Sequence, residues 1–182
     1  MIEIIFHGRG GQGAVTSAEM VAHAAISEGK YAQAFPNFGP ERRGAPVMAF
    51  ARVDDRPIRL RSKIYEPNFA VVLDPSLLEI INPENGMNGE GLVIINTHKP
   101  VSEIRKKYGY KSRLAVVDAS TIAREVLGLP ITNTTMLGAL VVTSHVVMEE
   151  SMLEPLKHRF GRIAEKNINA FKKAIQETKM EV

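Results

Sequence analysis

The stretch that decides the fold is Ile2-Glu3-Ile4-Ile5-Phe6-His7-Gly8-Arg9-Gly10-Gly11-Gln12-Gly13. Its apolar first half predicts a buried strand, and Ala14 to Glu28 after the glycines predicts a helix. Backbone N–H groups at such a helix N-terminus point outward, and the helix dipole favours negative charge there. Glycine lets the backbone turn tightly and approach a phosphate closely. We therefore predict an anion-binding turn, and its candidate residues are Gly8, Arg9, Gly10, Gly11, Gln12 and Gly13.

Strand-like and helix-like segments alternate along most of the chain. Further buried strands are predicted at Phe69 to Leu73, Leu92 to Ile95 and Leu114 to Val117. Further helices are predicted at Ser76 to Ile81, Ser102 to Tyr108, Ala119 to Leu127, Thr134 to Met148 and Gly161 to Lys179. This alternation predicts an α/β, Rossmann-like fold with a mostly parallel, doubly wound sheet. We find no repeat or linker, so residues 1–182 are expected to form a single domain.

The segment from Tyr31 to Lys63 interrupts the alternation and is strongly basic. Counted from Lys30 to Lys63, this part of the chain holds eight basic and three acidic residues, a balance of +5, whereas the whole chain carries +3. Prolines and glycines predict a loop over Phe35 to Ala45. Two strands, Pro46 to Val53 and Arg56 to Arg61, are expected around an Asp54-Asp55 turn. We therefore predict a basic β-hairpin inserted after the first βα unit, with Arg59 and Arg61 on one face. Arg42 and Arg43 of the loop join the candidate anion site.

Composition excludes several kinds of protein. The chain has no cysteine, which rules out disulfides and cysteine-bound zinc or iron–sulfur clusters. Its five histidines show no paired metal-binding spacing, so no metal site is predicted. No apolar run reaches the roughly 20 residues of a spanning helix, and no basic signal-peptide start is present. We therefore expect a cytoplasmic protein without a membrane or nucleic-acid partner.

The glycine motif alone leaves several ligands open. A dinucleotide site needs an acidic residue about 20 positions later to hold a ribose, and Lys30 to Phe35 contains none. The missing acidic residue disfavours NAD as the ligand, while Lys30 leaves NADP possible. A third alternative is a turn that binds no ligand and only packs a helix on the sheet. Asp74 and Asp118 follow predicted strands and are interpreted as helix caps. His7 either lines a site or caps a strand end.

No set of catalytic side chains accompanies the turn, and we predict no catalytic residue in this chain. The sequence has neither a G-x-S-x-G elbow nor a Walker A lysine. An anion-binding turn next to a basic loop is typical of a protein that binds a phosphorylated ligand while another chain performs the chemistry.

Several stretches together resemble one known family. Residues Gly8 to Gly13, Tyr31 to Gln33 and Phe35 to Val47, with its Glu41-Arg42-Arg43-Gly44-Ala45-Pro46-Val47, are similar to the gamma subunit of pyruvate (2-oxoacid):ferredoxin oxidoreductase. The resemblance continues through Arg59-Leu60-Arg61-Ser62, Ile64-Tyr65-Glu66-Pro67, Asn133-Thr134, Met136-Leu137-Gly138-Ala139, Glu165-Lys166-Asn167 and Ala170-Phe171. It spans essentially the whole chain in order. The Arg42-Arg43 pair is more similar to the pyruvate or 2-oxoisovalerate branch than to the 2-oxoglutarate branch.

The resemblance implies a subunit of a heterotetrameric enzyme. That enzyme converts pyruvate, coenzyme A and oxidised ferredoxin to acetyl-CoA, carbon dioxide and reduced ferredoxin. Thiamine diphosphate, magnesium and iron–sulfur clusters are then expected on the alpha, beta and delta subunits, and the isolated chain is expected to be inactive. Coenzyme A is expected to lie partly on this chain, with its phosphates near Gly8 to Gly13 and contacts from Arg9, Arg42 and Arg43. Two alternatives remain: a purely structural assembly subunit, and a separate NADP-binding protein.

Overall fold

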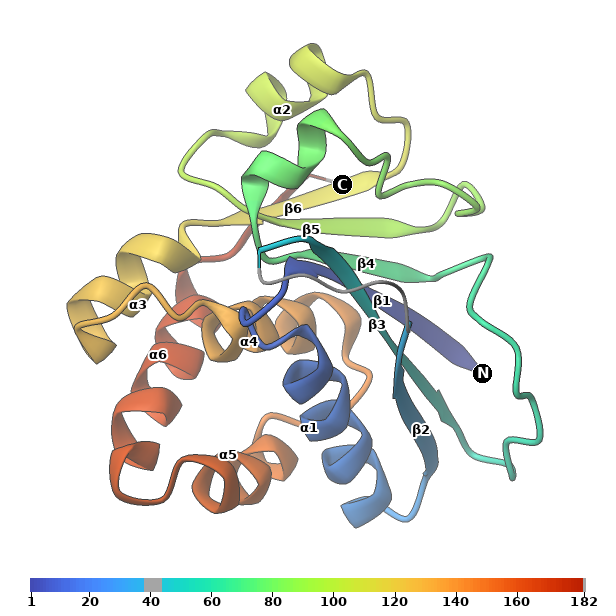
Figure 1. The fold of residues 1–182 in the computed structure, drawn as a ribbon, viewed down its shortest axis with the longest axis vertical. Helices are drawn as coiled ribbons and strands as arrows, with labels where there is room; N and C mark the ends of the chain where they lie inside the picture. The colour runs from blue at the N-terminus through green and yellow to red at the C-terminus, as the bar shows by residue number, and fades with distance from the viewer. Residues whose placement is uncertain (38–43, 182) are drawn as a thin grey trace.

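The fold centres on one seven-stranded sheet with the strand order β2-β3-β1-β4-β5-β6-β7. The computed structural model describes residues 1–37 and 44–181. The strands are β1 (Ile2–Arg9), β2 (Tyr31–Pro36), β3 (Pro46–Asp54), β4 (Phe69–Val72), β5 (Leu92–Asn96), β6 (Arg113–Val117) and β7 (Lys179–Glu181). Strands β1, β4, β5 and β6 are parallel, whereas β2, β3 and β7 pair antiparallel at the two sides (Figure 1). The predicted α/β, Rossmann-like fold is confirmed, with a sheet that is mixed.

The parallel strands form because their sequences are apolar without interruption. In β5, Ile94 and Ile95 point to opposite faces and both are fully buried. Strands that are covered on both faces need such continuous apolar runs. The strands predicted at Phe69 to Leu73, Leu92 to Ile95 and Leu114 to Val117 are therefore confirmed to within one residue at each end.

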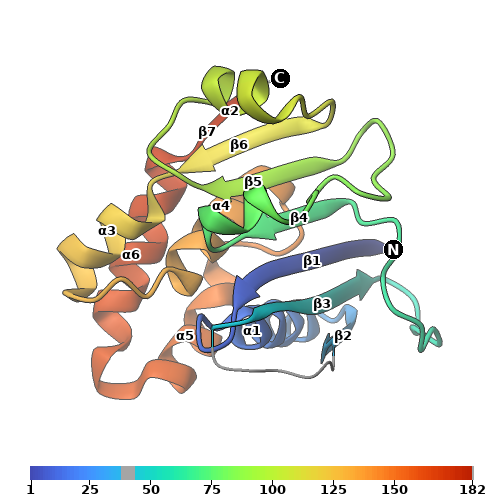
Figure 2. The ribbon, with the colours of Figure 1, turned by 45° about the horizontal axis from the view of Figure 1, so that its top comes forward.

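Helices cover both faces of the sheet. They are α1 (Ala14–Ser27), α2 (Val101–Tyr108), α3 (Ala119–Leu127), α4 (Asn133–Ser144), α5 (Leu153–Phe160) and α6 (Ala164–Glu177). Short 3-10 helices lie at η1 (Pro75–Glu79), η2 (Glu150–Met152) and η3 (Gly161–Ile163). Residues of α1 and α3 to α6 share one apolar core, and η1 and α2 contribute to a second core on the other face. Figures 1 and 2 show α2 apart from the other helices.

The predicted basic hairpin is wrong in its second strand. Strand β3 is already paired on both edges, with β1 on one side and β2 on the other. The actual partner is β2, for which the sequence predicts no strand and whose last two residues fall in the predicted loop; its Phe35 pairs with Phe50 across the ladder, with 5.2 Å between the ring centroids. The segment 56–61 therefore has no strand edge to join, and Arg59 and Arg61 are exposed in irregular structure.

The connections after β1 and β4 leave the sheet on opposite faces. The helix after β1, α1, packs into the core that contains Ala18 and Val21. The 3-10 helix after β4, η1, packs Leu77 and Leu78 into the other core. In open α/β sheets, ligands bind in the crevice at strand carboxyl ends where such a reversal occurs. The carboxyl ends of β1 and β4 therefore mark the place for a site.

Close packing of α4 on α6 depends on Gly138. A Cβ atom added to Gly138 would lie 2.3 Å from the backbone oxygen of Phe171. We expect Gly138→Ala to lower the free energy of unfolding by about 1–3 kcal/mol because the two helices must separate. Gly89→Ala is the matched control, since a Cβ there meets open space, and it should change stability by less than about 0.5 kcal/mol. Urea unfolding measures both variants, and equal midpoints would contradict the packing argument.

Candidate functional site

The glycine turn after β1 adopts the conformation that its glycines permit. Gly11 and Gly13 have φ angles of +92° and +83°, a region that other residues rarely enter. The Gln12 N–H donates to the Arg9 carbonyl at 3.0 Å, which closes the turn. The Gly10 N–H donates to the Ala45 carbonyl at 3.0 Å, which ties the turn to the segment before β3. Of the six residues predicted at this site, Gly8 and Arg9 therefore end β1, paired with Val47 and Pro46 of β3, and Gly10 to Gly13 form the turn.

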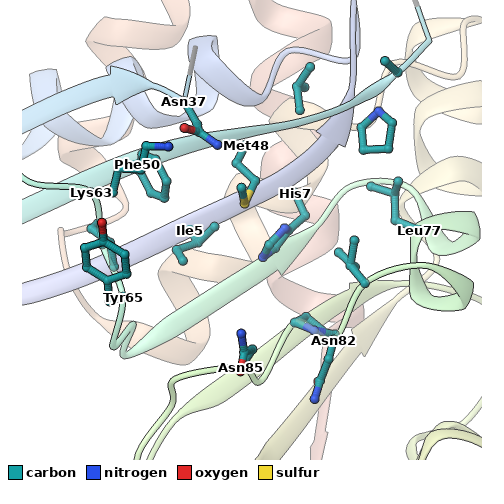
Figure 3. Close-up of a pocket in the computed structure, with 16 residues that line it drawn as sticks. Ile5, His7, Asn37, Met48, Phe50, Lys63, Tyr65, Leu77, Asn82 and Asn85 are labelled. Carbon is teal, nitrogen blue, oxygen red and sulfur yellow. The ribbon is translucent and has the colours of Figure 1, made fainter. Parts of the chain in front are cut away.

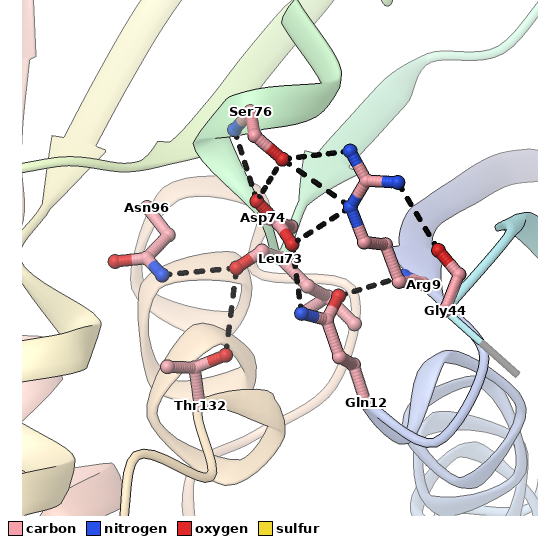
Figure 4. A network of polar contacts seen from close by, with 8 residues as sticks. All are labelled: Arg9, Gln12, Gly44, Leu73, Asp74, Ser76, Asn96 and Thr132. Carbon is pink, nitrogen blue, oxygen red and sulfur yellow. Dashed lines mark hydrogen bonds and ion pairs between the residues drawn. The ribbon is translucent and has the colours of Figure 1, made fainter.

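Polar side chains join this turn to the end of β4 (Figure 4). The Gln12 amide accepts from the Arg9 backbone N–H at 2.7 Å and donates to Asp74 Oδ2 at 2.8 Å. The Arg9 Nε lies 3.2 Å from the same Asp74 oxygen. Arg9 also donates to the Ser76 hydroxyl at 2.9 Å and to the Gly44 carbonyl at 3.1 Å. Strands β1 and β4 and the segment before β3 are thus held in one network.

Asp74 is the centre of that network and also caps η1. Its carboxylate accepts from the Ser76 backbone N–H at 2.9 Å, which confirms the predicted cap. Burial alone would raise the pKa of Asp74, but hydrogen bonds from Ser76 and Gln12 and the charge of Arg9 outweigh it. The pKa of Asp74 therefore lies below its ordinary value, and the carboxylate is ionised. Asp118 similarly caps α3 through the Thr121 N–H at 3.0 Å, as predicted.

The N-terminus of α1 opens onto a cavity of about 440 Å³. Helix α1 follows Gly13 with no side-chain cap and no acidic residue in its first turn. The first N–H groups of a helix have no partner within it, so those of Ala14, Val15 and Thr16 are free of intrahelical acceptors. Arg9 lines the cavity from β1 and Arg159 from α5, where its Nη2 donates to Thr16 Oγ1 at 3.4 Å. Two arginines and one helix N-terminus therefore face the same space.

Asn133 also lines this cavity and lies against Gly13. A Cβ atom added to Gly13 would lie 2.6 Å from Asn133 Nδ2, so the amide packs directly on the turn. Asn133 is 4% exposed, and its Oδ1 has no hydrogen-bond partner within the described part of the chain. A buried amide with spare hydrogen-bonding capacity is rare in proteins. Its position at the cavity is therefore consistent with a polar ligand.

Sequence reasoning missed Asn133 and Arg159 as cavity residues. Both lie more than 100 positions after the turn, and no local pattern signals that α4 and α5 return to it. Arg42 and Arg43, which were predicted to join the site, lie outside the described residues 1–37 and 44–181.

His7 faces a different cavity (Figure 3). This second cavity has a volume of about 570 Å³ and lies beside β1 and β3. His7 is 8% exposed, and burial lowers its pKa from the ordinary 6.5 to about 4. The imidazole is therefore neutral at physiological pH. His7 therefore lines a cavity, although not the one at the glycine turn.

Two negative findings apply to residues 1–37 and 44–181. No group of three or more His, Asp or Glu side chains there is placed to hold a metal ion. No helix among those residues is long and apolar enough to cross a membrane.

Comparison with known proteins agrees with the fold. The family model for pyruvate ferredoxin/flavodoxin oxidoreductase matches residues 3–177. The chain belongs to this family. The chain is 54% identical over 182 residues to the common gamma subunit of the pyruvate/ketoisovalerate oxidoreductases of Pyrococcus furiosus, covering 99% of this chain and 98% of that subunit. The predicted resemblance to a gamma subunit is confirmed.

Solved structures of the family share the architecture over the whole chain. The pyruvate oxidoreductase subunit PORC of Thermotoga maritima superposes with a TM-score of 0.88 at 35% identity, covering 100% of this chain and 98% of that one. The 2-oxoglutarate:ferredoxin oxidoreductase of Magnetococcus marinus, solved with 2-oxoglutarate, coenzyme A and succinyl-CoA bound, superposes with a TM-score of 0.79 at 18% identity. The match covers 96% of this chain but only 30% of that longer chain, so the same fold also occurs inside a larger polypeptide.

The neutral state of His7 makes stability depend on pH. In the unfolded chain His7 binds a proton below pH 6.5, whereas in the folded chain it does so only near pH 4. As the pH falls between these values, the free energy of unfolding should drop by up to about 3 kcal/mol through this residue. Urea unfolding at pH 7.5 and pH 4.5 measures the drop, and His7→Phe should reduce it. His158→Phe, at an exposed histidine, is the control, and an equal drop in wild type and His7→Phe would contradict the assignment.

Proposed function

We propose that this chain is the gamma subunit of a 2-oxoacid:ferredoxin oxidoreductase and that it holds the phosphates of coenzyme A at the glycine turn. The reaction is the conversion of pyruvate, coenzyme A and oxidised ferredoxin to acetyl-CoA, carbon dioxide and reduced ferredoxin. Support for this role comes from family membership over residues 3–177 and from the uncapped N-terminus of α1 beside two arginines. We expect residues 1–182 to form a single domain of that complex.

The cofactors of the reaction are assigned to partner chains. This chain has no cysteine with which to bind an iron–sulfur cluster. We place thiamine diphosphate, its magnesium ion and the iron–sulfur clusters on alpha, beta and delta subunits, and the site of ferredoxin reduction with them. Thiamine diphosphate supplies the means to stabilise a carbanion at the carbonyl carbon of the 2-oxoacid. The residues of the present chain would then bind and orient coenzyme A.

The uncapped helix N-terminus is the observation that carries the phosphate role. A diphosphate accepts hydrogen bonds from free N–H groups and is favoured by the helix dipole. Arg159 and Arg9 add charge-assisted contacts, although Asp74 already neutralises part of the Arg9 charge at 3.2 Å. Coenzyme A is also the ligand in the solved Magnetococcus marinus enzyme, whose chain contains this fold. We propose Gly8 to Gly13, Arg42 and Arg43 as the contact residues predicted by sequence, with Arg159 and Asn133 added.

Fixing the diphosphate would help catalysis by position alone. A coenzyme A molecule that is held at its phosphates presents its thiol within a limited volume, which raises the effective concentration at a neighbouring subunit. This contribution needs no proton transfer from the gamma subunit. It also explains why an anion site occurs in a chain without a recognisable nucleophile or general base.

A single charge at the first turn of α1 tests the phosphate role. Thr16→Asp places a carboxylate at a helix N-terminus that has none, which should leave the fold equally stable or more stable by about 0.3–1 kcal/mol. The same carboxylate repels a phosphate and pairs with Arg159. In the purified complex we expect the KM for coenzyme A to rise about tenfold, a loss of about 1.4 kcal/mol of binding. Thr16→Asn is the neutral control and should change KM little. An unchanged KM in a stable Thr16→Asp complex would overturn the phosphate site.

The two predicted loop arginines require their own test because docking to another subunit is a competing role. If Arg43 contacts phosphate, Arg43→Ala should raise the KM for coenzyme A about tenfold, with the complex intact. Steady-state kinetics and gel filtration of the reconstituted complex provide both readouts. Loss of assembly with an unchanged KM would favour docking, and an unchanged KM in an intact complex would remove Arg43 from the site.

A further inference from the structure

The cavity that His7 lines is not used by the anion site, yet it has the size of a ligand site. Its volume of about 570 Å³ lies within the roughly 300–1,000 Å³ typical of small-molecule sites. Its floor is apolar and is formed by Ile5 of β1 with Met48 and Phe50 of β3. In β1, Ile4 and Phe6 point to the opposite face and belong to the core under α1. The cavity is therefore separated from the core by the sheet itself.

Two polar groups in this cavity lack partners within the described chain. His7 is 8% exposed, and burial alone accounts for its lowered pKa, with no hydrogen bond contributing. Asn37 Oδ1 is buried and has no hydrogen-bond partner among residues 1–37 and 44–181. Figure 3 shows the His7 ring between Ile5 and Leu77, with Asn82 and Asn85 across the cavity. A buried acceptor without a donor destabilises the protein, and a ligand amino group would supply the missing hydrogen bond.

The lining selects a neutral, flat and polar-edged ligand. None of the described residues that line the cavity is acidic, Lys63 is the one basic side chain with a fixed charge, and His7 is neutral. A phosphate group would lose its hydration against Ile5, Met48 and Phe50 without enough compensation. A purine base instead buries its faces against apolar side chains and offers donors and acceptors at its edge. Asparagine amides pair well with the amino group and ring nitrogen of adenine.

The two cavities are neighbours along the start of β3. Val47 lines both of them, and Ala45, whose carbonyl accepts from Gly10, borders the His7 cavity. The glycine-turn cavity lies on the α1 face of the sheet and the His7 cavity on the η1 face. A nucleotide that passes around the start of β3 places its diphosphate at the glycine turn and its base beside His7. We propose that the His7 cavity binds the adenine base of coenzyme A, an inference that rests on the proposed phosphate role of the glycine turn.

Removal of the base from the substrate gives the test. The assembled enzyme is assayed with coenzyme A and with 4′-phosphopantetheine, which keeps the thiol and one phosphate but lacks the adenosine and the remaining phosphates. His7→Phe keeps a ring of similar size and removes both nitrogens. We expect this variant to raise the KM for coenzyme A about tenfold, with an unchanged kcat and a KM for 4′-phosphopantetheine within twofold of wild type.

A second variant and a control separate an effect on binding of the base from an effect on folding. Asn37→Ala removes the unpartnered oxygen but keeps the backbone bond from Asn37 to the Met48 carbonyl at 2.9 Å, and it should show the same selective change. Asn88→Ala, at an exposed position outside both cavities, should behave as wild type. An unchanged KM for coenzyme A in both variants, or equal rises for the two substrates, would overturn the base site. Failure of the phosphate site is seen separately, as an unchanged KM in Thr16→Asp.

Discussion

The site depends on the Asp74 carboxylate, which holds the ends of two parallel strands together. Strands β1 and β4 already pair in the sheet, but their connections leave on opposite faces, and Asp74 joins these connections through its side chain. Asp74 contacts Gln12 at 2.8 Å and Arg9 at 3.2 Å, so the turn between β1 and α1 is fixed from the neighbouring strand. Ionisation of Asp74 strengthens both contacts, since hydrogen bonds to a charged group are stronger than neutral ones. The shape of the turn is thus set by tertiary contacts as well as by its glycines.

The same contact limits what Arg9 can contribute to an anion. Its guanidinium already contacts Asp74, Ser76 and the Gly44 carbonyl. A ligand would therefore compete with these groups for its N–H donors. The first N–H groups of α1, by contrast, receive no hydrogen bond from a capping side chain at Gly13 and remain available to a ligand. Among residues 1–37 and 44–181, the Arg159 side chain has one polar contact, a long hydrogen bond of 3.4 Å to Thr16. Arg9 is therefore best understood as a residue that positions the turn, while α1 and Arg159 present most of the available positive potential to the cavity.

Local patterns in the sequence predicted the parallel strands, the glycine turn and the two aspartate caps because each is determined by neighbouring residues. The hairpin failed for a different reason. Two segments, Tyr31–Pro36 and residues 56–61, could pair with the free edge of β3. The first one does so as β2, with a contact between Phe35 and Phe50, whereas the second carries alternating arginines. Asn133 and Arg159 reach the cavity only after α4 and α5 have packed on the sheet. No periodicity within the sequence indicates that α4 and α5 pack next to the glycine turn. Long-range contacts of this kind therefore cannot be predicted from local sequence patterns.

The register of β1 links the two cavities to one another. The glycine turn, Gly10 to Gly13, follows directly on β1, whose alternate residues Ile5 and His7 face the second cavity. A shift of β1 by one residue against β3 would turn His7 into the apolar core and Phe6 into the cavity. The pairing of His7 with Met48 and of Phe6 with Ala49 opposes that shift, because the small Ala49 leaves room for the Phe6 ring in the core. One strand register therefore sets both the neutral histidine of the second cavity and the position at which the glycine turn begins.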